Sequence, residues 1–212
     1  MVEQQIRTWD VLDSQVLELL FAIRREEFVP PSYRNLAFAD LEIPLNDSRD
    51  PGQRMWSPKL EARVLQALHV QPSDEVLEIG TGSGYLTALL AHRARQVTSV
   101  EIDTGLAAAA RARLAAHNVT NAQVETGDGA RGWRAGELFD VIVLTGSTPV
   151  LSRLLTEQLK PGGRLFAVIG AEPAMHARLV TKGASGQPND RDLFETVIAP
   201  LINAPQPERF VF

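Results

Sequence analysis

The sequence of 212 residues contains no cysteine and no long apolar run. Without cysteine, the chain cannot form disulfide bonds, zinc–thiolate sites or iron–sulfur clusters, and it cannot use a thiol as a nucleophile. No stretch approaches the roughly 18 consecutive apolar residues of a membrane-spanning helix. The first residues also lack the charged and apolar regions of a secretory signal, so we expect a cytoplasmic protein that does not act at a membrane.

Positive charge is scarce as well. The chain has 21 Lys and Arg residues against 26 Asp and Glu residues, which gives a formal net charge of −5. Because no dense basic block offsets this balance, binding to the phosphate backbone of a nucleic acid is not expected. The histidines have no metal-ligand spacing, so no metal site is expected either. They are His69, His92, His117 and His176.

What the chain does contain is an alternation of short apolar runs and helical stripes. Apolar residues make up 44% of the sequence, and its length suits one α/β domain with a small appendage. The strand candidates are Glu75–Ile79, Gln96–Val100, Ala122–Glu125, Phe139–Leu144 and Arg164–Ile169. The helix candidates between them are Tyr85–Arg93, Leu106–His117 and Val150–Leu159. This alternation predicts a mostly parallel sheet covered by helices on both faces.

The chain divides into two predicted units near residue 57. Residues 1–56 begin with helical stripes, for one of which Asp13 is the predicted N-cap, and then pass into a proline-rich loop, so we interpret them as a helical and loop appendage. Residues 57–212 hold the predicted sheet. Near their end, Ala177–Thr181 and Leu193–Ile198 are expected to pair as an antiparallel hairpin at the sheet edge.

A glycine-rich turn follows the first strand of the predicted sheet. Its residues are Gly80, Thr81, Gly82, Ser83, Gly84 and Tyr85. Glycines let the backbone approach a ligand without a Cβ in the way, and N–H groups at the start of the following helix favour negative or electron-rich ligand atoms. The glycine spacing is G-x-G-x-G, whereas a dinucleotide fingerprint is G-x-G-x-x-G, which disfavours a nicotinamide cofactor.

Three carboxylates fall at the ends of successive predicted strands. Glu78 precedes the glycine turn, where it would repel a phosphate but suit a cationic or amino-bearing ligand. Glu101, followed by Ile102, ends the next strand, where a carboxylate can accept hydrogen bonds from both ribose hydroxyls. Gly127-Asp128-Gly129 follows the third strand and offers an acceptor for an adenine amino group. The alternative for each residue alone is an ordinary strand-end or turn residue, but their joint pattern is far more specific and indicates a nucleoside site.

This pattern resembles the first motifs of S-adenosylmethionine-dependent methyltransferases with a Rossmann-like sheet, so we expect S-adenosyl-L-methionine as the cofactor. Further motifs occur in the order seen in protein-L-isoaspartate O-methyltransferases. They include Arg25–Pro30, Ala37–Asp40, Val76–Tyr85, Gly127–Trp133 and Gln158–Leu165. The resemblance runs from residue 2 to about residue 202. It implies methyl transfer to the carboxylate of isoaspartyl residues in damaged proteins or peptides, with the appendage covering the acceptor site.

One loop departs from the family pattern, which is Gly-Gln-Thr-Ile-Ser-x-Pro on the acceptor side. Here Arg54 takes the threonine position, Trp56 takes the serine position, and Ser57 lies one residue late. Arg54 is either a partner of an acceptor carboxylate or a solvated loop residue. Trp56 is either a wall of the acceptor pocket or a lid residue packed on the appendage. Ser57 is expected to cap the helix that starts at Pro58, a role that does not exclude contact with the substrate.

A second departure follows the fourth strand, where Thr145, Ser147 and Thr148 offer hydroxyl groups. These groups lie either beside the transferred methyl group or at the N-cap of the next helix.

The resemblance implies little acid–base chemistry, because a carboxylate acceptor is already ionised at neutral pH. Alignment of the reacting atoms and exclusion of water are expected to provide most of the catalysis. The catalytic candidates are Arg54, Trp56, Ser57 and Thr145.

Two other functions remain open at this point. Because Arg54 and Trp56 alter the acceptor side, the chain could be a divergent relative that methylates a different acceptor, such as a small molecule. It could also bind S-adenosylmethionine without catalysis. The sequence does not indicate an oligomeric state.

Overall fold

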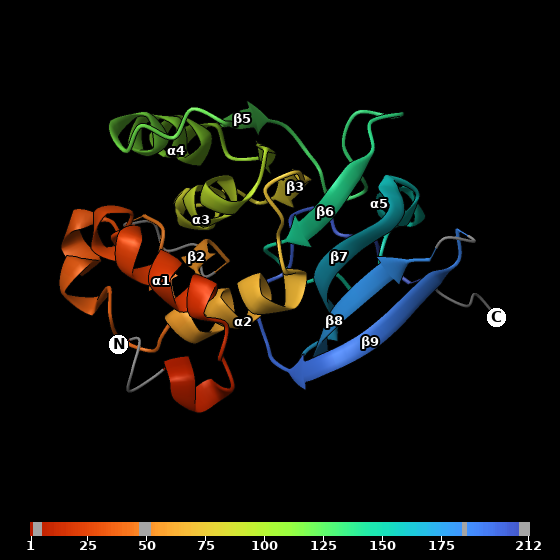
Figure 1. Ribbon diagram of the computed structural model, residues 1–212, viewed down its shortest axis with the longest axis horizontal. Coiled ribbons are helices and arrows are strands. Elements are labelled where there is room, and N and C mark those ends of the chain that lie inside the picture. Colours follow the sequence, from red (N-terminus) through yellow and green to blue (C-terminus); the bar gives the residue numbers. More distant parts are fainter. Residues whose placement is uncertain (2–5, 47–51, 184–185, 208–212) are drawn as a thin grey trace.

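The computed structural model describes residues 1, 6–46, 52–183 and 186–207. A seven-stranded sheet with the order β5-β4-β3-β6-β7-β8-β9 forms its centre (Figure 1). The strands are β3 (Glu75–Ile79), β4 (Gln96–Glu101), β5 (Ala122–Thr126), β6 (Phe139–Leu144), β7 (Leu159–Ala171), β8 (Ala174–Lys182) and β9 (Pro188–Glu195). The first five are mutually parallel, and β8 and β9 add antiparallel strands at the edge. The predicted Rossmann-like sheet with an antiparallel edge hairpin is confirmed.

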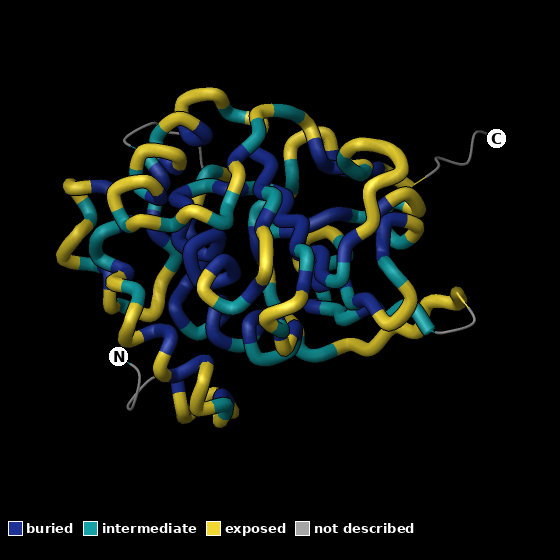
Figure 2. The backbone as a smooth tube through the Cα atoms, turned by 45° about the horizontal axis from the view of Figure 1, so that its top comes forward, coloured by how far each residue is buried: buried dark blue, intermediate teal, exposed yellow. Residues whose placement is uncertain are grey.

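Helices cover both faces of this sheet, and the burial pattern of the strands separates the two faces. On one face, α2 (Pro58–Leu68), α3 (Tyr85–Arg93) and α4 (Thr104–Ala116) share a core with Val76 of β3. On the other face, Leu77 of β3 belongs to a second core with Leu155 of α5 (Arg153–Glu157). Successive strand residues point to opposite faces, which explains why the central strands are apolar at nearly every position. Figure 2 shows the buried backbone at the centre of the molecule and exposed loops around it.

Several predicted elements differ from the structure in their bounds, among them the last helix and the last strand. The helix predicted over Val150–Leu159 is only the short α5, because Leu159 already pairs with Phe139 as the first residue of β7. The last strand is β9, which begins at Pro188 instead of Leu193. Pro188 already pairs with Lys182 of β8, so polar residues enter the strand, which lies on an exposed sheet edge. Because these polar residues interrupt the apolar alternation, the sequence pattern predicted the start of this strand too far along the chain.

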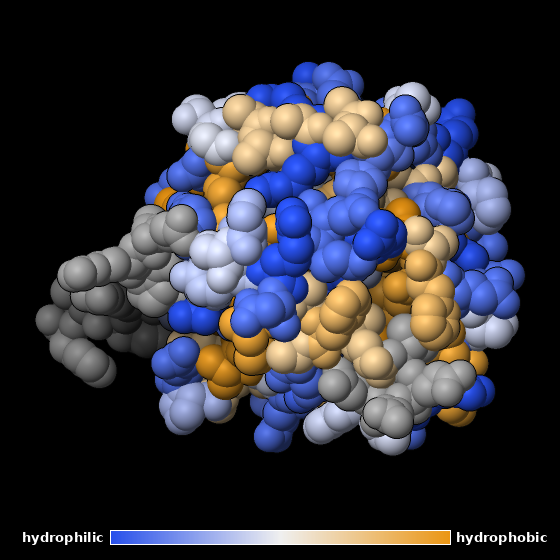
Figure 3. All heavy atoms as spheres, turned by 90° about the vertical axis from the view of Figure 1, so that its left-hand side faces the viewer, coloured by the Kyte–Doolittle hydropathy of each residue, from blue (hydrophilic) through white to orange (hydrophobic). Residues whose placement is uncertain are grey.

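The N-terminal part consists of short elements packed beside the sheet. They are η2 (Arg7–Trp9), α1 (Ser14–Ala22), η3 (Arg25–Glu27), η4 (Pro31–Leu36), β1 (Ile43–Pro44) and β2 (Arg54–Met55), with β1 and β2 paired antiparallel. The predicted cap of α1 is confirmed, since the Asp13 carboxylate accepts hydrogen bonds from the N–H groups of Gln15 and Val16. On the side of the molecule that carries this part, apolar patches alternate with polar side chains (Figure 3). No helix among the described residues is long and apolar enough to cross a membrane.

A buried arginine joins the N-terminal part to the rest of the molecule. Arg25 is 1% exposed, and its Nε donates a hydrogen bond to the main-chain oxygen of Ala37 at 2.9 Å. One terminal nitrogen forms an ion pair with Glu61 of α2, and the other donates to the main-chain oxygen of Trp56 at 2.5 Å. The guanidinium carbon also lies 5.3 Å from the centre of the Tyr85 ring. We call these five residues the Arg25 cluster.

We predict that the Arg25–Glu61 pair is needed for folding stability. Glu61→Ala should lower the free energy of unfolding by about 3–5 kcal/mol, because it leaves a buried guanidinium without its counter-charge. Chemical denaturation at neutral pH measures this loss. Replacing both charges, in Arg25→Met with Glu61→Leu, should cost less than Glu61→Ala alone.

The matched control is the half-exposed pair of Lys59 and Asp40, whose charged atoms lie 2.8 Å apart. Asp40→Ala should cost no more than about 1 kcal/mol, since solvent screens that pair. Equal losses for Glu61→Ala and Asp40→Ala would contradict the role given to the buried pair.

Candidate functional site

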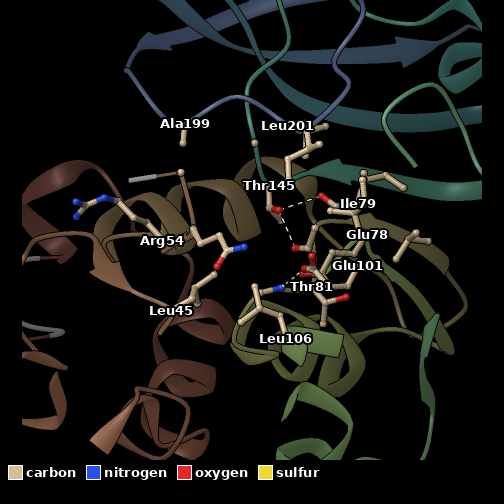
Figure 4. A pocket seen from close by; sticks show the side chains of 18 of the residues that line it. Leu45, Arg54, Glu78, Ile79, Thr81, Glu101, Leu106, Thr145, Ala199 and Leu201 are labelled. Atoms are coloured by element: carbon tan, nitrogen blue, oxygen red, sulfur yellow. Dashed lines mark hydrogen bonds between the residues drawn. The ribbon is translucent and has the colours of Figure 1, made fainter. Parts of the chain in front are cut away.

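A cleft lies along the carboxyl ends of the parallel strands, where the strand order reverses between β3 and β6. Ligands of open α/β sheets bind at such a reversal. About 1020 Å³ of empty space lies within this cleft, a volume that includes the solvent at its open mouth. Thirteen of the predicted site residues line it: Arg54, Trp56, Glu78, Gly80, Thr81, Gly82, Ser83, Glu101, Ile102, Gly127, Asp128, Gly129 and Thr145. Figure 4 shows the carboxylates of Glu78 and Glu101 near Thr145 and across the cleft from Arg54.

The glycine turn is fixed by contacts that leave no room for a larger residue. Gly80 has a φ of +96°, and a Cβ built on it would lie 2.1 Å from Oγ1 of Thr145. The Thr145 hydroxyl lies 2.9 Å from the main-chain oxygen of Ile79 and 2.7 Å from that of Gly80, to which it donates. This threonine therefore holds the turn against the end of β6.

The hydroxyl groups after β6 do not cap a helix, so that interpretation was wrong. The N-cap of α5 is Ser152, not a residue of this loop. The Ser147 hydroxyl donates to the main-chain oxygen of Ile198, and the Thr148 hydroxyl donates to that of Val150. All three hydroxyl groups, including that of Thr145, are used to fix loop backbone.

Glu101 presents a preoriented carboxylate to the cleft. Its Oε2 accepts a hydrogen bond from the N–H of Gly82 at 2.8 Å, and its Oε1 accepts from the N–H of Asp103 at 3.0 Å. The side chain is 6% exposed. Each oxygen has a further lone pair, so the carboxylate can accept two more hydrogen bonds in a fixed orientation.

Glu78 lies deeper and is fully buried. Its Oε2 accepts hydrogen bonds from the hydroxyls of Thr87 at 2.5 Å and Ser99 at 2.6 Å. Its Oε1 is buried without a hydrogen-bond partner. Burial raises the pKa of Glu78 to about 8, an effect that the two hydroxyls only partly offset and that the nearby Glu101 charge reinforces. An unsatisfied buried carboxylate oxygen on a cleft wall is costly unless a ligand donates to it.

The Gly-Asp-Gly motif after β5 surrounds an exposed carboxylate. A Cβ on Gly127 would lie 2.5 Å from the Trp133 ring, which explains why this glycine occurs together with that tryptophan. Asp128 accepts hydrogen bonds through Oδ1 from the N–H of Ala130 at 3.0 Å and through Oδ2 from the side chain of Asn203 at 2.8 Å. The carboxylate is thus held at both oxygens at the rim of the cleft.

Three predicted site residues do not line the cleft. Gly84 lies behind it, against Ala110 of α4. The Tyr85 side chain is fully buried in the Arg25 cluster, because the residue begins α3 on the side that faces the core. Ser57 is the N-cap residue of α2 with Pro58 after it, as predicted, but its hydroxyl makes no capping hydrogen bond and it does not line the cleft.

The part of the cleft predicted to receive the acceptor is formed by β2 and the residue after it. Trp56 is 5% exposed and lies edge-on to Phe166, with ring centres 6.1 Å apart. Arg54 is exposed and points away from Glu101 and Thr145 toward the outer part of the cleft (Figure 4). Glu42 lines this part too, and burial raises its pKa while the charge of Arg54 opposes that shift. Trp56 is therefore both a cleft wall and a packed residue.

Sequence reasoning missed the segment that forms the opposite wall. This C-terminal segment is Ile198–Asn203, and five of its residues, Ile198 to Ile202, line the cleft. Two main-chain hydrogen bonds of 2.9 Å attach it to Ser147, one from the Ser147 N–H to the Ala199 oxygen and one from the Leu201 N–H to the Ser147 oxygen. The segment has no regular structure or charged motif, so nothing in the sequence connected it with the cleft.

The comparisons with known proteins agree with this geometry. The family model of protein-L-isoaspartate (D-aspartate) O-methyltransferase matches residues 1–206. The chain belongs to this family. It is 38% identical over 205 residues to protein-L-isoaspartate O-methyltransferase 1 of Anaeromyxobacter sp. (strain Fw109-5), covering 96% of this chain and 95% of the relative. It is 41% identical over 172 residues to the protein of the same name from Rhodopseudomonas palustris (strain HaA2), covering 81% of this chain and 69% of the relative.

Solved structures of the same family share the fold. A protein-L-isoaspartate O-methyltransferase matches with a TM-score of 0.81 at 24% identity, covering 96% of this chain and 66% of that one. A second structure, from Plasmodium falciparum in complex with S-adenosyl-L-homocysteine, matches with a TM-score of 0.77 at 17% identity, covering 95% and 96%. At these identities the likeness concerns the fold alone.

S-adenosylmethionine is the cofactor of this family, and the cleft fits it. The unpartnered Oε1 of Glu78 suits an amino group, and the oriented Glu101 carboxylate suits a pair of hydroxyls. The glycine turn leaves its backbone open, since a Cβ on Gly82 would lie 3.1 Å from Leu45 and would narrow the space. Among the described residues, no cluster of three or more acidic or histidine side chains could hold a metal ion.

We predict a pH signature for the buried Glu78. Its pKa of about 8 lies above its ordinary value of 4.5, so the folded state binds the proton more tightly than the unfolded chain. The stabilisation from this proton is complete below about pH 4.5 and is lost as the pH rises toward 8. Glu78→Gln, which keeps an acceptor for both hydroxyls, should remove this dependence.

Urea unfolding of both proteins between pH 5 and 8 tests this expectation. The wild-type free energy of unfolding should fall relative to that of Glu78→Gln by at most about 1.4 kcal/mol per pH unit. Parallel profiles for the two proteins would show that Glu78 does not titrate in this range.

Proposed function

We propose that this chain transfers the methyl group of S-adenosylmethionine to the carboxylate of an isoaspartyl residue in a protein or peptide. The observation that supports this most strongly is the cleft, which unites a glycine turn and three strand-end carboxylates with an apolar acceptor side in a chain of this family. The relatives named above carry the isoaspartyl activity in their names. The alternatives of a small-molecule acceptor and of a non-catalytic binding protein receive no comparable support.

On the cofactor side, each carboxylate has a distinct role. Glu101 would accept hydrogen bonds from the two ribose hydroxyls, and Asp128 would accept one from the adenine amino group. Glu78 would accept one from the amino group of the methionine part, which would satisfy its unpartnered oxygen. Ile102 supplies an apolar surface beside Glu101, and the turn from Gly80 to Ser83 lets the cofactor approach the backbone.

The proposed methyl transfer requires little general acid or base catalysis from the side chains. S-adenosylmethionine, when bound, supplies an electrophilic methyl group on a sulfonium. A carboxylate acceptor with an ordinary pKa of about 4 is ionised at neutral pH, so no general base has to remove a proton. In keeping with this, no histidine occurs among the described residues that line the cleft. The chain has to align the acceptor oxygen and exclude water.

The acceptor side is suited to those two tasks. Trp56 and Met55 form a buried apolar wall, which keeps water from the reacting groups. Arg54, at the outer end of the cleft, would pair with a carboxylate of the substrate, a role for which its planar donor group is suited. Thr145 supports the reaction indirectly by holding the glycine turn.

A methyl-transfer assay tests the proposed function. The purified protein is given labelled S-adenosylmethionine with an isoaspartyl peptide or with its aspartyl twin, and the isoaspartyl peptide alone should be methylated. Glu101→Gln should raise the KM for the cofactor by about 10- to 100-fold, because it weakens hydrogen bonds to a charged group. Methylation of neither peptide, or of both equally, would refute the proposal.

We also predict that Trp56 sets which isoaspartyl peptides are accepted. Trp56→Ser should widen the acceptor side, so that peptides with phenylalanine after the isoaspartate gain about tenfold in kcat/KM relative to peptides with glycine there. The KM for S-adenosylmethionine should stay unchanged, because the cofactor carboxylates are untouched.

Trp56→Phe is the matched variant, since it keeps an aromatic ring beside Phe166 and should shift the ratio only slightly. Circular dichroism and thermal unfolding check that both variants fold, because Trp56 is packed as well as cleft-lining. An identical peptide preference in wild type, Trp56→Phe and Trp56→Ser would rule out this role.

A further inference from the structure

The C-terminal segment Ile198–Asn203 reaches from the acceptor side of the cleft to the rim that carries Asp128. Figure 4 shows Ala199 above the acceptor side, which is marked by Arg54, and Leu201 above Thr145. The segment is attached to Ser147 at two main-chain positions and ends with the side chain of Asn203 on Asp128. It therefore touches the proposed nucleoside site at a point 75 residues away in the sequence.

The backbone at Asn203 is shaped for this contact. Its φ is +63°, a left-handed conformation that most side chains disfavour but that asparagine and glycine adopt readily. The N–H of Ala204 donates to the main-chain oxygen of Leu201 at 3.1 Å, which closes a tight turn around Asn203. This turn brings the Asn203 amide to 2.8 Å from Oδ2 of Asp128.

We propose that Asn203 is a positioning residue of the nucleobase site, which acts by fixing the carboxylate of Asp128. The inference rests on the proposed function, in which Asp128 accepts a hydrogen bond from the adenine amino group. With Oδ1 held by the Ala130 N–H and Oδ2 held by Asn203, the carboxylate cannot rotate freely. Its remaining lone pairs are then oriented before the ligand binds, which lowers the ordering cost of binding.

The contact also links the nucleobase site to the wall above the acceptor. Because the same segment supplies Leu201, which lies against Gly80 and Gly146, an ordered Asn203 keeps this wall in place over the glycine turn. The primary effect is nevertheless expected on affinity for the nucleoside, since the side-chain hydrogen bond of Asn203 goes to Asp128.

Isothermal titration calorimetry with S-adenosylhomocysteine tests the proposal. Asn203→Gly keeps the left-handed backbone but removes the amide, and it should raise the Kd three- to tenfold. Asn203→Asp keeps the turn but places a like charge against Asp128, and it should raise the Kd further. Asn189→Gly, on the exposed edge strand β9, is the matched control and should leave the Kd unchanged.

A ligand without the 6-amino group separates positioning from a general structural effect. The loss in Asn203→Gly should be absent with S-inosylhomocysteine, and it should also be absent when Asp128 is already replaced by asparagine. In the transfer assay, the KM for S-adenosylmethionine should rise while kcat at saturation stays the same.

The outcomes separate the two proposals. If the wild type does not bind S-adenosylhomocysteine, both the proposed function and this inference fail. If the wild type binds it but Asn203→Gly and Asn203→Asp bind it equally well, the inference alone fails. Equal losses with the adenosyl and inosyl ligands also overturn it, because they would show that Asn203 acts on the fold of the segment and not on the nucleobase contact.

Discussion

The burial of the Arg25 charge is the constraint on which the cleft depends. A guanidinium removed from water destabilises the fold by several kcal/mol unless its donors are satisfied and its charge is paired. Its partners come from separate parts of the chain: the loop after η4 supplies Ala37, α2 supplies Glu61, and the end of β2 supplies Trp56. The guanidinium also lies over Tyr85 at the start of α3. All of these elements must be in place before the charge is satisfied, so β2 and Trp56 are fixed relative to α3, the helix that follows the glycine turn.

On the proposed cofactor side, the groups that burial destabilises are carboxylates, and their hydrogen bonds are only partly satisfied. Glu78, Glu101 and Asp128 bring three carboxylates to one edge of the sheet, and the burial of Glu78 raises its pKa to about 8. The fold offsets part of this through hydroxyl and main-chain donors, but one oxygen of Glu78 has no partner. Such a locally unfavourable arrangement is typical of a site whose ligand completes it. Two costly buried groups, the Arg25 guanidinium satisfied within the fold and the Glu78 carboxyl group left with an unpartnered oxygen, thus distinguish scaffold from binding site.

The bounds of helices and strands were predicted most accurately where local sequence patterns alone determine them. The strands β3 and β6 and the helix α3 were predicted with their observed bounds, because apolar runs and a glycine turn define them within a few residues. The three carboxylates were found for the same reason, since Glu78 and Glu101 lie in the last two residues of β3 and β4 and Asp128 lies two residues after the end of β5. The C-terminal segment was not, because its place depends on hydrogen bonds to Ser147 and Asp128 far away in the sequence. Tyr85 was misplaced because a helix start can face either the cleft or the core, and only packing against Arg25 decides between them.

The way in which Trp56 is held explains how this position can differ from the family pattern without loss of the fold. Arg25 binds the main-chain oxygen of Trp56, which every residue type has, so any side chain at this position receives the same hydrogen bond from the cluster. The ring itself is free to pack on Phe166 and to form a wall of the cleft. Because the anchor is a main-chain atom, the side chain that we propose to face the substrate can change while the Arg25 charge stays satisfied. On this argument, differences at this position among relatives with the same buried pair change which substrates are accepted and leave the cofactor site as it is.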